Sequence, residues 1–67
     1  MPRYVVIVAW EDSGVEDADE IEVVAENQQG AIQRAKRRWR EAVFQSYPAC
    51  RIVQAFILTA AKKRALA

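Results

Sequence analysis

The stretch that most constrains the fold is RYVVIVAW, at residues 3–10. Its β-branched and aromatic residues predict a strand. Side chains alternate along a strand, so one face carries Tyr4, Val6, Val8 and Trp10, and the other carries Val5, Ile7 and Ala9. Both faces are apolar, which is typical of a central strand that is covered on both sides.

Two further strands are predicted. The run EIEVVAE at 20–26 alternates between inward aliphatic residues and outward glutamates, as a half-buried edge strand does. The run RIVQAFILT at 51–59 predicts the third strand. Strict alternation places Val53, Ala55 and Ile57 on one of its faces and Ile52, Gln54, Phe56 and Leu58 on the other.

A helix is expected between the second and third strands. Asn27 is a suitable N-cap, and the helix is predicted to run to about Ser46, before Pro48 forces extended geometry. Its apolar arc contains Ile32, Ala35, Trp39, Ala42 and Val43. Trp39 is therefore expected in the core. The polar stretch at 11–19, EDSGVEDAD, is predicted to be a wide loop that contains a Ser13-Gly14 turn.

These elements predict an α+β fold with a single β-β-α-β domain over residues 1–59. The helix returns the chain to the start of the second strand, and a right-handed crossover then places the first strand in the middle. The expected sheet has three antiparallel strands in the order 2-1-3, with one helix packed on one face. Residues 60–67, AAKKRALA, are expected to form a basic C-terminal tail or a short helix.

One helix can cover only one face of this sheet. The other face would expose aliphatic and aromatic side chains from at least two strands, and a contiguous patch of that kind marks an interface. A homodimer that buries sheet against sheet is the simplest expected remedy.

Several chemistries are disfavoured by what the 67 residues lack. There is no histidine, so the commonest general base and metal ligand is missing. Cys50 is the only cysteine, which excludes an intrachain disulfide and a cysteine zinc site. Gly14 and Gly30 are isolated and form no phosphate-binding loop. We therefore expect a protein that is not an enzyme and that needs no cofactor.

The sequence also gives expectations about metal binding and cellular location. A cation site would use Asp12, Asp17, Asp19 and Glu20, but Gly14 does not stand where a calcium loop requires it, so no metal is expected. No apolar run approaches the roughly 18–20 residues of a membrane span, and no signal peptide is recognised. With a single cysteine, a reducing cytoplasm is the expected location.

Charge is strongly segregated, although the net charge is only +1. Eight of the nine acidic residues lie within 11–26, and five basic residues crowd the helix between 34 and 40. Either surface is a candidate for a protein partner. The candidate contact residues are Trp10, Asp12, Glu16, Asp17 and Asp19 on the acidic side, and Arg37, Arg40 and Phe44 on the helix side.

Nucleic-acid binding is the alternative function for the basic helix face. Arginine and lysine would neutralise phosphates, and Phe44 or Tyr47 would stack on a base. The residues available for this are Arg34, Arg37, Arg38, Arg40, Lys62 and Lys63. A solvated helix face explains the same pattern, because arginine is also a good helix former.

The layout of the chain resembles the small α+β proteins carried by phages and mobile elements. The strand YVVIVAW, the acidic stretch, the run EIEVVAEN leading into GAIQRAKRRW, and the strand RIVQAFILT carry this resemblance. Some anti-CRISPR proteins are similar in size and in β-β-α-β order. The resemblance implies a non-enzymatic inhibitor of a bacterial defence complex, and it assigns no residue a role.

Overall fold

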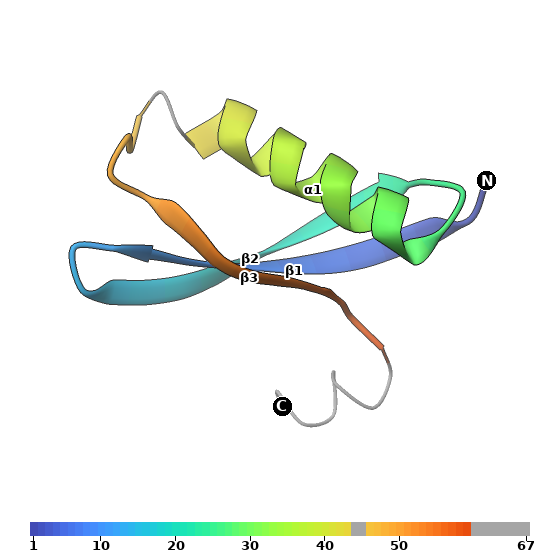
Figure 1. Cartoon of the computed structure of the whole chain (residues 1–67), viewed down its shortest axis with the longest axis horizontal. Helices are drawn as coiled ribbons and strands as arrows, with labels where there is room; N and C mark the ends of the chain where they lie inside the picture. The colour runs from blue at the N-terminus through green and yellow to red at the C-terminus, as the bar shows by residue number, and fades with distance from the viewer. Residues whose placement is uncertain (44–45, 60–67) are drawn as a thin grey trace.

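The computed structural model describes residues 1–43 and 46–59 (Figure 1). Its elements are β1 (Arg3–Asp12), β2 (Val15–Val24), α1 (Gln28–Val43) and β3 (Arg51–Ile57). The strands form an antiparallel sheet in the order β2-β1-β3, and α1 lies across one face of it. The predicted α+β fold class, strand order and central first strand are confirmed.

The connection between β1 and β2 differs from the prediction. The prediction of a wide loop over residues 11–19 is wrong, because Asp12 pairs with Val15 and only Ser13 and Gly14 form the turn. Both turn residues have positive φ, 53° and 85° respectively. That combination defines a type I′ turn, whose twist matches the twist of the two strands and pairs them up to the tip. The acidic residues 16–20 therefore lie in a strand.

A β-bulge changes the predicted faces of β3. The register shifts between Ala9 and Trp10, so Gln54 pairs with Ala9 while Ile52 pairs with Trp10. Val53 is the extra residue and is 59% exposed. Ile52 consequently packs against the core on the helix side with Ala55 and Ile57, which the strict alternation expected of this strand did not predict.

The hydrophobic core lies between the sheet and α1. Side chains on one face of β1 and β2 meet small residues of the helix, so the helix can approach the sheet closely. The buried members are Val6, Val8, Val23, Ala25, Ala31, Ala35, Trp39 and Cys50. The predicted core position of Trp39, which is 3% exposed, is confirmed.

Both ends of α1 are set by local hydrogen bonds. Asn27 is confirmed as the N-cap, because its Oδ1 accepts the Gly30 N–H at 2.8 Å. The helix is described as far as Val43, and the two residues before the predicted end at about Ser46 lie outside the described residues. The carbonyl of Val43 accepts the backbone N–H groups of Ser46 and Tyr47, at 3.1 and 2.8 Å, which closes the last turn.

Two arginines of α1 are bonded to the outer edge of β2. Arg34 Nη1 donates to the carbonyl of Val24 at 3.1 Å, and Arg38 Nη1 donates to that of Glu22 at 2.8 Å. Four residues of helix rise about 6 Å, and two residues of strand about 6.6 Å, so the spacings match. These bonds occupy carbonyls that an added strand would need, and so protect this edge of the sheet.

The sheet face away from α1 is apolar along β1 and β3. Ile7 is only 8% exposed there, although it does not belong to the helix-side core. It pairs with Phe56 on β3 and with Glu20 on β2. Val5, Ala9, Phe56 and Leu58 are half-buried. This face therefore exposes less apolar surface than is expected of a sheet covered by one helix on its other face. The basic segment expected at 60–67 lies outside the described residues.

The turn geometry predicts different effects for two substitutions. Gly14→Ala should lower the free energy of unfolding by about 1 kcal/mol, because an L side chain disfavours the left-handed region. A Cβ at this position meets no atom within 4 Å, so the penalty is conformational. Ser13→Asn should cause no loss, since asparagine tolerates positive φ. Urea unfolding measures both, and equal effects would contradict the type I′ turn.

Candidate functional site

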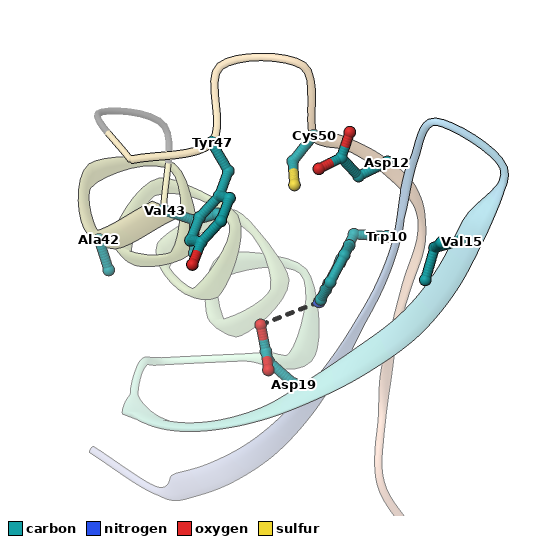
Figure 2. Close-up of a pocket in the computed structure, with 8 residues that line it drawn as sticks. All are labelled: Trp10, Asp12, Val15, Asp19, Ala42, Val43, Tyr47 and Cys50. Carbon is teal, nitrogen blue, oxygen red and sulfur yellow. Dashed lines mark hydrogen bonds between the residues drawn. The ribbon is translucent and has the colours of Figure 1, made fainter.

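A cavity of about 460 Å³ lies at the end of the molecule where the hairpin, the end of α1 and the 46–50 connection meet (Figure 2). Its lining combines aromatic, acidic and small apolar side chains. The lining residues are Trp10, Asp12, Val15, Asp19, Ala42, Val43, Tyr47 and Cys50.

Each lining residue is placed by its element. Trp10 and Asp12 are two residues apart on β1 and so share a face, as do Val15 and Asp19 on β2. Tyr47 comes from the connection, whose turn is closed by the Cys50 N–H donating to the Tyr47 carbonyl at 3.0 Å. Because the hairpin is tight, its acidic strand reaches this end of the molecule instead of looping away.

Asp19 joins the two tryptophans of the chain. Its Oδ2 accepts the Nε1–H of Trp10 at 3.0 Å and that of Trp39 at 2.9 Å. The two indole rings lie 6.4 Å apart between centroids and are tilted by 38°. Trp39 is buried, so Asp19 satisfies a donor that would otherwise be left without a partner. The same carboxylate fixes the orientation of the Trp10 ring in the cavity wall.

Cys50 is held in its neutral form. Burial raises the pKa of the thiol above its ordinary value, and the negative charges of Asp12 and then Asp19 raise that pKa further. The thiolate is the nucleophilic form, so this cysteine is a poor nucleophile at neutral pH. It acts as a small apolar member of the core cluster.

The acidic candidates are only partly brought together. Trp10, Asp12 and Asp19 line the cavity. Glu16 and Asp17 do not line it. With Trp10 they line a separate hollow of about 420 Å³. The charges at this end are largely uncompensated. Within the described residues, the ion pairs are Arg51–Glu11 at 2.7 Å and Arg3–Glu22 at 3.3 Å.

The helix-side candidates lie elsewhere. Arg37 and Arg40 are exposed on α1 and line neither hollow, and Phe44 lies outside the described residues. Of the nucleic-acid candidates, Arg34 and Arg38 are engaged with the edge of β2, as described above. Lys62 and Lys63 also fall outside the part of the chain that the structure describes.

Sequence reasoning missed the apolar half of the site. Val15, Val43, Tyr47 and Cys50 come from the start of β2, the end of α1 and the connection, and no spacing in the sequence links them. The signal that would have found Val15 was the Ser-Gly pair, since a two-residue turn places Val15 directly opposite Asp12.

The four acidic residues considered for a cation do not converge. Alternation along β2 puts Glu20 on the opposite face from Asp17 and Asp19. In residues 1–43 and 46–59, no group of three acidic or cysteine side chains is arranged to hold a metal ion.

Comparison of the chain with known protein families, with curated proteins and with solved structures finds no match in any of the three. The described part of the chain contains no helix that is both long enough and apolar enough to cross a membrane.

The paired indole bonds predict that Asp19 is a stabilising residue. Asp19→Ala should lower the free energy of unfolding by roughly 2 kcal/mol, because it leaves two indole donors without an acceptor. Glu20→Ala is the matched control, an exposed residue next along the same strand, and should change stability by less than about 0.5 kcal/mol. Urea unfolding followed by tryptophan fluorescence measures both. Equal losses in the two variants would contradict the role assigned to Asp19.

Proposed function

We propose that this chain is a small non-enzymatic protein–protein interaction module that binds a basic protein surface through its hairpin end. The observation that supports this most directly is the cavity in which Trp10 and Tyr47 lie beside the carboxylates of Asp12 and Asp19. Aromatic side chains in a pocket with a charged rim are the usual composition of a binding hot spot.

Electrostatics favours a basic partner. The carboxylates of Asp12, Glu16, Asp17 and Asp19 have no ion-pair partner within the described residues. Like charges gathered at one end raise the local negative potential, which speeds encounter with a positive surface and disfavours acidic ones. Asp17, on the cavity face of β2, and Glu16, on the opposite face, would therefore steer the partner to the hairpin end, and the cavity would hold it.

A binding role suits the chemistry better than catalysis does. The one cysteine has a raised pKa, and the chain has no histidine to act as its base. An inhibitor of a bacterial defence complex, as the architectural resemblance implies, would be one instance of such a module. The lone cysteine is the reason for proposing a cytoplasmic location.

We also propose self-association through the face of the sheet opposite α1. Its support is the half-buried apolar stripe of Val5 and Ala9 on β1 beside Phe56 on β3, bordered by glutamates of β2. A two-fold arrangement would set stripe against stripe and leave the glutamates at the rim. The cavity would stay free, since it lies on the helix side of the sheet.

Nucleic-acid binding by α1 is a weaker proposal. Arg37 and Arg40 are exposed, but Arg34 and Arg38 donate to backbone carbonyls of β2. The acidic end of the molecule would also repel a phosphate backbone. This alternative requires binding to a generic oligonucleotide at low salt that weakens steeply as salt is added.

The first prediction from the proposed function concerns the partner. The double variant Glu16→Lys/Asp17→Lys should capture its protein partner from a lysate of the native host at least about tenfold less than the unchanged chain, because the steering charges are reversed. The matched control Arg37→Glu should capture as much as the unchanged chain. Affinity capture with quantitative mass spectrometry measures both.

Two outcomes of this experiment would overturn the proposed hairpin interface. In the first, Arg37→Glu abolishes capture while the hairpin variant captures normally, which would move the interface to α1. In the second, an oligonucleotide binds at low salt and Arg37→Glu removes that binding, which would favour the nucleic-acid alternative.

A second prediction concerns the oligomer. The chain should sediment as a dimer at high micromolar concentration, and Val5→Lys should shift it to a monomer, because a charge would be buried in the apolar stripe. Glu22 pairs with this position, so the lysine has a partner in the monomer. Arg37→Glu should leave the dimer intact. A monomer for the unchanged chain would refute the self-association.

A further inference from the structure

We infer that the cavity at the hairpin end is a binding site for an arginine side chain presented by a basic protein segment. This inference rests on the proposed function, and it names the group that the partner would insert between Trp10 and Tyr47. Three features support it: two aromatic rings, two carboxylates, and apolar walls that suit the methylene stem.

Two aromatic side chains, Trp10 and Tyr47, line the cavity. The Trp10 ring is held in place by its hydrogen bond to Asp19, as Figure 2 shows, and Tyr47 lies across the hollow with 59% of its surface exposed. An aromatic face attracts a cation, most strongly when the ring is that of tryptophan. A planar guanidinium can also stack on such a ring, which an ammonium cannot do. The fixed indole would thus be a prepared surface for arginine.

The carboxylates supply the charge. Both indole bonds of Asp19 use Oδ2, so its Oδ1 receives no hydrogen bond from a described residue. Asp12 accepts the exposed Ser13 hydroxyl on its Oδ1 at 3.1 Å, and the Cys50 thiol also bonds to this carboxylate. No described basic residue lines the cavity. A guanidinium has five N–H donors in a fork and can form a charge-assisted hydrogen bond with either carboxylate.

The remaining wall suits the rest of an arginine side chain. Val15, Ala42 and Val43 are apolar, and Cys50 is a neutral thiol. Long cationic side chains cover such surfaces with their methylene groups while the charged head bonds at the far end. A volume of about 460 Å³ admits one such side chain together with some water.

Other occupants fit less well. An aliphatic or aromatic side chain would remove water from the Asp12 and Asp19 carboxylates without giving them a partner. A phosphate or an acidic side chain would be repelled by them. The hollow formed by Arg34, Arg38 and Glu22 is already spanned by hydrogen bonds within the fold, so it is not an equivalent site.

The test uses the two indole N–H signals of the ¹⁵N-labelled chain as reporters. The probe is the blocked peptide Ac-Gly-Arg-Gly-NH₂, compared with the same peptide carrying citrulline, a neutral isostere of arginine, or lysine. The arginine peptide should shift the Trp10 signal saturably, with a Kd on the order of 1 mM. The citrulline peptide should bind at least about tenfold more weakly, and the lysine peptide should lie between them.

Two variants locate the site. Asp12→Asn keeps the shape of the side chain and should weaken binding of the arginine peptide about fivefold or more. Glu20→Gln removes an equal charge from the other face of β2 and should leave binding unchanged. Both variants should unfold at the same urea concentration as the unchanged chain. The inference is overturned if arginine and citrulline bind alike, if neither shifts Trp10, or if Glu20→Gln weakens binding as much as Asp12→Asn does.

Failure of this inference can be told apart from failure of the proposed function. A partner captured through Glu16 and Asp17, combined with no binding of the arginine peptide, would mean a flat interface with no inserted side chain. Binding of the arginine peptide, combined with capture that ignores the hairpin charges, would leave the pocket in place and refute the proposed partner surface.

Discussion

One carboxylate joins the sheet to the helix at the hairpin end. Asp19 accepts the indole N–H of Trp10 from the neighbouring strand and that of Trp39 from α1 on a single oxygen. Because both indoles bond to the same carboxylate oxygen, β1, β2 and α1 are held together at the hairpin end. The carboxylate also sets the Trp10 ring in the cavity wall, so the geometry of the candidate site follows from a bond that stabilises the fold.

The helix is fastened differently along its length. Near its start, Ala31 and Ala35 are fully buried and let the helix lie close to the sheet. Along its side, Arg34 and Arg38 bond to β2 carbonyls. Two arginines of the basic helix face predicted from the sequence are thus hydrogen-bonded to the backbone of β2. Within the described residues, the carboxylates of Asp12, Glu16 and Asp17 have no ion-pair partner, which is why the hairpin end is the stronger candidate surface.

Particular residues mark how far sequence reasoning reached. The double-faced apolar run at 3–10 predicted a central strand correctly, and Asn27 predicted the start of α1, because both signals are local. Val53 shows the limit. Its place depends on a bulge opposite Trp10, and a bulge is decided by how two strands pair over their whole length. For the site, Trp10, Asp12 and Asp19 could be chosen by residue type, whereas Tyr47 and Cys50 could not be joined to them.

The sequence by itself determined the elements, their order and the crowding of acidic charge into one stretch, since periodicity, capping and crossover handedness are properties of short segments. Only the tertiary structure decided that this stretch is a strand, and that one of its carboxylates faces two tryptophans. The physical reason is cooperative pairing: residues with weak strand propensity became a strand because a two-residue turn held them against an apolar neighbour, and side-chain partners then followed from the register.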